Sequence, residues 1–96
     1  SNITKKINSR VFKNKLTSNF LINPKYPEIA RKLGLEGSVK YDIYVDPSGK
    51  PLKAILIKSS GHEILDYNAK NSIMQSKFSN KENMEVILNL TVKYIL

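Results

Sequence analysis

The clearest pattern in the chain is an alternation of hydrophobic and polar positions in two segments, 37–46 and 84–95. In the first segment the apolar positions are Val39, Tyr41, Ile43 and Val45. In the second, Val86, Leu88, Leu90, Val92 and Tyr94 alternate with Ile87, Asn89, Thr91, Lys93 and Ile95. Because successive side chains of a β-strand point to opposite faces, this period of two predicts two half-buried strands.

A turn and a further strand follow the first alternating segment. The turn is predicted at Asp46-Pro47-Ser48-Gly49-Lys50, where proline presets one central φ angle and glycine supplies a positive one. Beyond it, the apolar run from Leu52 to Ile57 predicts the return strand of a β-hairpin.

Two other segments have the spacing of helices. Residues 63–78 predict a helix with one apolar face. That face carries Leu65, Ala69, Ile73 and Phe78. Residues 27–33 predict a short helix that begins at Pro27 and is stopped by Gly34, because proline suits the first helical position and glycine the position after the last turn.

Together these elements predict an α+β fold of two layers. The second helix carries the chain back across the sheet, so the last strand runs antiparallel to the first. The most economical packing is a three-stranded antiparallel sheet of order 2-1-3 with two helices packed on one face. The last strand then lies at an edge, where unpaired N–H and C=O groups can template another extended chain. The alternative is an edge that is solvated or covered by the N-terminal residues.

The first 21 residues differ from the rest of the chain. We expect residues 1–21 to be a basic, flexible or weakly helical lead-in, and residues 22–96 to form one folded domain. The lead-in has only a weak helical spacing of apolar positions, at Ile3, Ile7, Val11 and Leu16. Its Asn and Ser side chains compete for backbone hydrogen bonds and oppose a stable helix.

The net charge of +8 is concentrated toward the N-terminus. Residues 1–40 hold nine Lys or Arg against two Glu, whereas residues 41–96 hold seven against six acidic residues. Such a basic arm is compatible with nucleic acid, an anionic membrane surface, an acidic protein partner or simple solvation. Aromatic residues that could stack on bases are sparse there, which disfavours nucleic-acid binding.

Candidate catalytic and metal-binding residues are few. The chain has no cysteine, and His62 is its single histidine, in a loop without a second ligand at metal spacing. No serine lies in a strand–turn–helix elbow, and no pair of carboxylates is placed for acid–base chemistry. We therefore predict that the protein is not an enzyme and uses no metal or cofactor.

The segment Asn23-Pro24-Lys25-Tyr26-Pro27 is rigid and extended, because each proline restricts itself and the residue before it. Such a segment has little conformational entropy to lose when a partner docks on it.

This segment and the motifs that follow it resemble the C-terminal domain of the TonB family, over roughly residues 22–96. The further motifs are Ala30-Arg31-Lys32, Leu35-Glu36-Gly37-Ser38-Val39, Val45-Asp46-Pro47-Ser48-Gly49-Lys50, Ser59-Ser60-Gly61 and Leu65-Asp66-Tyr67-Asn68-Ala69. Two features depart from the family pattern. Asn23 stands where Gln is usual, and residues 75–80 replace a Trp-rich stretch that ends in Pro.

The resemblance implies a periplasmic binding module that transmits inner-membrane proton-motive energy for active uptake of nutrients such as iron complexes, cobalamin or nickel. It would capture the Ton box of outer-membrane transporters as a strand added to the last strand. The residues expected to bind this partner are Asn23, Pro24, Lys25, Tyr26, Pro27, Val86, Ile87, Leu88, Asn89, Leu90, Thr91, Val92, Lys93 and Tyr94. Asn23 keeps the donor and acceptor of the usual Gln with a shorter reach.

The resemblance also implies an inner-membrane anchor, a single transmembrane helix that precedes these residues in a longer protein and couples it to ExbB and ExbD. No run in the chain approaches the roughly 20 apolar residues that such a helix needs. The main alternative is a TolA-like or other periplasmic scaffold domain that tethers envelope proteins. A small basic nucleic-acid-binding protein is a third reading.

Overall fold

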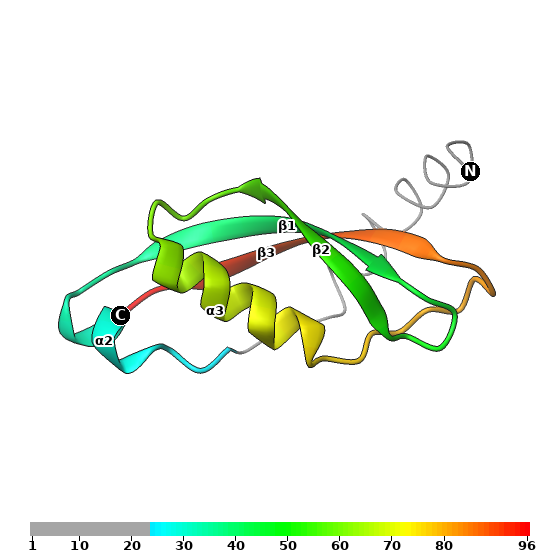
Figure 1. The fold of residues 1–96 in the computed structure, drawn as a ribbon, viewed down its shortest axis with the longest axis horizontal. Coiled ribbons are helices and arrows are strands. Elements are labelled where there is room, and N and C mark those ends of the chain that lie inside the picture. The colour runs from blue at the N-terminus through cyan, green and yellow to red at the C-terminus, as the bar shows by residue number, and fades with distance from the viewer. Residues whose placement is uncertain (1–23) are drawn as a thin grey trace.

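The three strands form one antiparallel sheet with two helices beside it (Figure 1). The computed structural model describes residues 24–96, so the predicted lead-in over residues 1–21 lies outside the described residues. In chain order the elements are α2 (Glu28–Lys32), β1 (Gly37–Val45), β2 (Pro51–Lys58), α3 (Glu63–Met74) and β3 (Val86–Tyr94). The strand order is β2-β1-β3, and β1 is antiparallel to both neighbours, which confirms the predicted α+β fold.

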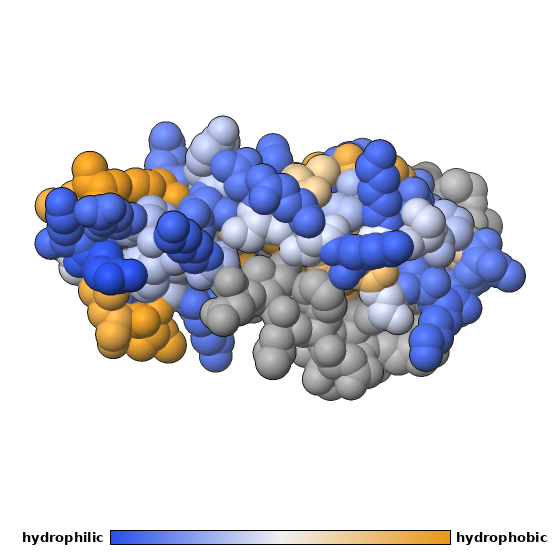
Figure 2. Space-filling view, turned by 90° about the horizontal axis from the view of Figure 1, so that it is seen from below, coloured by the Kyte–Doolittle hydropathy of each residue, from blue (hydrophilic) through white to orange (hydrophobic). Residues whose placement is uncertain are grey.

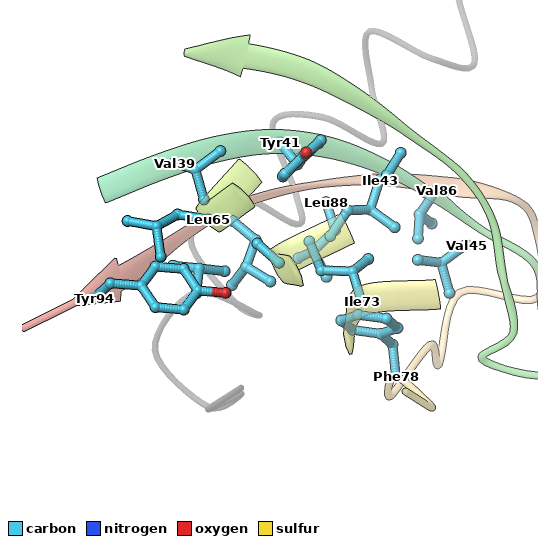
Figure 3. Close-up of a cluster of buried hydrophobic side chains, with 14 of the residues drawn as sticks. Val39, Tyr41, Ile43, Val45, Leu65, Ile73, Phe78, Val86, Leu88 and Tyr94 are labelled. Atoms are coloured by element: carbon cyan, nitrogen blue, oxygen red, sulfur yellow. The ribbon is translucent and has the colours of Figure 1, made fainter. Parts of the chain in front are cut away.

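The core lies between the sheet and α3, which crosses one face, whereas α2 and the C-terminus lie together at one end (Figure 1). The alternating residues of β1 and β3 supply the sheet side of this core, as the sequence predicts. Figure 3 shows the side chains of Leu65 and Ile73 from α3 among those of the strands. Fully buried members include Val39, Ile43, Val45, Val86 and Leu88.

The helix α3 ends at Met74, so the prediction of a helix to residue 78 is wrong at its C-terminal end. Phe78 is nevertheless buried, because the chain folds back and places its ring in the core (Figure 3). It follows Ile73 by five residues, which is not the spacing of one helix face. The N–H of Phe78 donates to the carbonyl of Gly49, 2.8 Å away, and so joins this segment to the hairpin turn.

The short helix α2 begins at Glu28, one residue later than predicted, because Pro27 is the N-cap with extended angles (φ −61°, ψ 133°). The helix ends at Lys32, one residue before the predicted last residue, and Gly34 follows the C-cap Leu33 with a positive φ of 70°. The N–H of Leu35 donates to Ala30 O (2.9 Å) and that of Gly34 to Arg31 O (3.1 Å), a pair of bonds that satisfies the last carbonyls of a helix.

The connection from β2 to α3 is held by a buried carboxylate. Asp66 accepts hydrogen bonds from the hydroxyl of Ser59 and from the N–H (2.9 Å) and hydroxyl (2.6 Å) of Ser60. Burial raises the pKa of Asp66, but these hydrogen bonds outweigh it and leave the pKa below its ordinary value. The backbone of Asp66 also accepts from the Tyr41 hydroxyl (2.7 Å), which links α3 to β1.

Replacing Gly49 with Ala should destabilise the fold strongly. Gly49 has φ +93°, and an added Cβ would lie 2.1 Å from the Phe78 carbonyl oxygen. Gly61 is the matched control, because it has the same φ but open space around it. We expect Gly61→Ala to cost about 1–2 kcal/mol through backbone strain and Gly49→Ala to cost a further 1–3 kcal/mol or so through the clash. Urea unfolding measures both, and equal losses would contradict the described contact.

The stability of the fold should fall in acid partly because of Asp66. Its folded pKa is lowered, so the unfolded chain takes up a proton first, and stability is lost as the pH falls from about 4 through the folded pKa. Asp66→Asn should lower the free energy of unfolding at pH 7 by about 1.5–3 kcal/mol and flatten its decline in acid. Exposed Glu63, in the first turn of the same helix, gives the control Glu63→Gln. Urea melts from pH 7 into the acid range that leave the slope of Asp66→Asn unchanged would refute this assignment.

Candidate functional site

The two edges of the sheet differ in regularity. The pairing of β2 with β1 shifts register twice, between Tyr44 and Val45 and between Lys40 and Tyr41. These shifts leave Leu52 and Ile57 as extra residues in β2. Such bulges bend and twist an edge strand away from further pairing. By contrast, β3 pairs with β1 in an unbroken register from Val86 to Tyr94. The outer edge of β3 is therefore the regular one.

Half of the β3 side chains cannot meet a partner, because they form the core. Leu88 and Tyr94, for example, are almost completely buried. On the opposite face, Asn89 donates to the Asp42 carboxylate (2.8 Å) on β1, and Thr91 and Lys93 are exposed. Within residues 24–96, no strand pairs with the outer edge of β3. What this edge can offer is mainly its backbone N–H and C=O groups.

Residues 24–27, called the proline segment from here on, lie at the C-terminal end of β3. The ring of Tyr26 meets that of Tyr94 edge to face, with 5.4 Å between centroids and 89° between planes. The Tyr26 hydroxyl donates to the carbonyl of Leu35, which follows α2. Burial and the Glu36 carboxylate raise the pKa of Tyr26, so its hydroxyl stays protonated and able to donate at neutral pH. This tyrosine thus fixes the segment to both α2 and β3.

Tyr94 is the residue on which these contacts converge. Its side chain is 2% exposed, and its hydroxyl donates to Asn68 Oδ1 on α3, 2.6 Å away. Burial, with Tyr41 and the Asp66 carboxylate nearby, raises the pKa of Tyr94 far above its ordinary value. A neutral, fully enclosed hydroxyl therefore ties the end of the edge strand to the helix that covers the sheet.

A hollow of about 480 Å³ opens beside this junction. It is lined by Lys25, Tyr26, Pro27, Glu28, Arg31, Lys32 and Asn68. Its three cations outnumber its single carboxylate, which belongs to Glu28 and lies 3.4 Å from the Lys32 ammonium. Figure 2 shows hydrophilic side chains at this end of the molecule, flanked by hydrophobic patches.

The predicted partner-binding residues come together only in part. Tyr26 lies against Tyr94, whereas Val86 is at the far end of β3, paired with the last residue of β1. The prediction for Asn23 lies outside the described residues. The assignment of the proline segment and β3 to partner binding stays a prediction.

Four residues that line the hollow, Glu28 among them, were not predicted from the sequence to bind a partner. Arg31 and Lys32 were noted only as part of a family motif, and Asn68 only as a member of another. One signal could have found Asn68. It is a polar residue three positions after Leu65 and one before Ala69, and therefore borders the apolar stripe of the helix.

None of the helices among residues 24–96 combines the length and hydrophobicity that a membrane crossing needs.

Comparison with known proteins gives consistent matches. A family model described as Gram-negative bacterial TonB protein C-terminal matches residues 22–96. The chain is 50% identical to Protein TonB of Vibrio cholerae over 58 residues, which are 60% of this chain and 24% of that protein. It is 38% identical to Protein tonB2 of Pseudomonas aeruginosa over 55 residues, 57% of this chain and 20% of that protein. The matches thus span a quarter or less of these curated relatives. No solved structure matches the chain.

The hydroxyl of Tyr94 should contribute measurably to stability. Tyr94→Phe keeps the ring and its contact with Tyr26 but removes the bond to Asn68, so we expect a loss of about 0.5–1.5 kcal/mol in the free energy of unfolding. The control is Tyr67→Phe on α3, where the side chain is 68% exposed and the change should stay within about 0.5 kcal/mol. Equal effects of the two substitutions in urea unfolding would contradict the role given to this hydroxyl.

Proposed function

The chain belongs to the TonB C-terminal family, and from this premise we propose that it binds the Ton box of outer-membrane transporters as a strand added to β3. We further propose that it acts in the periplasm as part of a longer protein. That protein is anchored in the inner membrane, is driven through ExbB and ExbD, and passes the energy on for nutrient uptake. The role is one of binding and force transmission, without catalysis.

The observation that carries this proposal is the difference between the two sheet edges. A guest strand needs a row of evenly spaced backbone groups, and β3 keeps an unbroken register with β1 along its whole length. The other edge is interrupted at Leu52 and Ile57, and it carries Lys53 and Lys58. Bulges and lysines are the devices that discourage pairing at an edge. The fold therefore favours one edge for a partner strand.

A backbone ladder suits a protein that serves several transporters. Alternate side chains of β3 are committed to the core, so recognition depends largely on main-chain hydrogen bonds that do not distinguish side chains. Each bond contributes roughly 0.5–1.5 kcal/mol net. A ladder of about five such bonds gives affinities weaker than roughly 1 μM. Such a complex forms and releases readily.

The proline segment supports the transmission of force. It is the part of the described chain that enters the domain first, and Tyr26 joins it directly to Tyr94 at the end of β3. A pull on the chain before residue 24 would therefore reach the strand that carries the partner without first crossing the whole core.

NMR titration of the labelled domain with a synthetic Ton-box peptide tests this proposal. We expect the amide signals of residues 86–94 to shift and those of residues 51–58 to remain in place. A peptide of the same composition with proline at its centre is the control, because proline removes a donor from the ladder. Shifts confined to residues 51–58 would show that the peptide binds at the edge formed by β2 and would contradict the proposal. A peptide that shifts the signals of neither strand would refute it as well.

A further inference from the structure

The residues that line the hollow beside α2 carry more positive than negative charge. Glu28 lies close to Lys32, which leaves Lys25 and Arg31 as the other cations of the lining. Among residues 24–96, no carboxylate lies within salt-bridge distance of either side chain. A cation with no carboxylate partner among the described residues is available for an anion from outside.

The lining also offers hydrogen-bond donors suited to a carboxylate. The guanidinium of Arg31 has a planar fork that matches the two oxygens of a carboxylate. Asn68 accepts from Tyr94 through Oδ1, so its side-chain NH₂ group remains available to donate. The hollow therefore combines positive charge with donors from α2 and α3.

The hollow is linked to the end of β3 through residues that contact Tyr94. Two of its lining residues, Tyr26 and Asn68, also contact Tyr94 through their side chains. A strand added along the outer edge of β3 would thus bring one of its flanks to the mouth of the hollow. The opposite end of β3, at Val86, pairs with Val45 at the far end of β1.

We propose that this hollow binds the carboxylate of an Asp or Glu side chain in the docking segment, at the flank that lies beside the C-terminal end of β3. The inference rests on the proposed strand addition to β3. The ladder supplies affinity that is indifferent to sequence, whereas the hollow selects partners with an acidic flank and fixes their register. A single charged contact at one end is sufficient for both effects, because sliding the guest by two residues would withdraw its carboxylate from the hollow.

Calorimetry with matched peptides tests the proposal. Two pairs of Ton-box peptides are extended by one residue, either Glu or Gln, at the N-terminal flank in one pair and at the C-terminal flank in the other. Glu and Gln have nearly the same shape, so each pair differs in the charge of the carboxylate and in the amide group that replaces it. At one flank and not the other, we expect the Glu peptide to bind about three- to fivefold more tightly. Because the contact is ionic, the preference should shrink in high salt.

Two variants of the domain locate the contact. Arg31→Gln should abolish the preference for Glu and leave the Gln peptide unaffected. Lys58→Gln makes the same change of charge on the opposite edge of the sheet and should preserve the preference. NMR shifts of residues 86–94, recorded with every peptide and variant, report whether the ladder itself has formed.

The outcomes separate this inference from the function it rests on. Equal binding of Glu and Gln peptides at both flanks, with shifts in β3, overturns the carboxylate site and leaves strand addition intact. A preference that Lys58→Gln removes as well would reflect the overall charge of the domain and would also overturn the site. Binding of phosphatidylglycerol vesicles that Arg31→Gln abolishes, without any peptide preference, would assign the hollow to lipid instead. If no peptide shifts β3, strand addition and the site both fail.

Discussion

The unbroken pairing of β1 with β3 is the constraint on which the rest of the structure depends. It aligns the alternate apolar residues of both strands on one face, and this face forms one wall of the core. Because β1 pairs with a strand on each side, β2 and β3 are the two edge strands of the sheet. The pairing of β2 with β1 contains two bulges, whereas that of β3 is regular. Packing and the proposed site therefore have a common origin. The same register that buries Leu88 and Tyr94 also leaves a straight row of backbone groups outside.

Tyr94 connects this sheet to the remainder of the candidate site. As the last residue of β3, it contacts Tyr26 from the proline segment and Asn68 from α3. Three parts of the chain that are far apart in sequence thus meet at one buried ring. The cationic hollow borders the same place, so the features that distinguish one partner from another would lie at one end of the edge strand.

Much of the fold follows from the sequence because alternation is a local signal. The strands β1 and β3 follow from it, whereas the turn at residues 46–50 follows from its proline and glycine, and the strand order follows from the most economical packing of the elements. Phe78 was misassigned to α3 because a buried aromatic residue continues an apolar pattern even where the chain has left the helix. The bulges at Leu52 and Ile57 could not be predicted, since an apolar run gives no alternation in which an extra residue would show.

The site was less accessible to prediction than the fold. The family motifs point to the proline segment and β3, but Arg31 and Asn68 lie 37 positions apart in the sequence, and no local pattern indicates that they line one hollow. Their proximity depends on Tyr94, which contacts Tyr26 just before α2 and Asn68 on α3. Such a contact follows from tertiary packing and becomes visible only with the structure.

In the proposed function, the outer edge of β3 receives a partner strand through its backbone. The most direct measurement is a scan in which each N–H of a Ton-box peptide is methylated in turn and the affinity for the domain is determined. In an added strand only alternate N–H groups point toward the receptor edge. We expect the affinity to fall by about tenfold at every second position and to be retained between them. Uniform affinity across all positions, or losses without a period of two, would contradict it.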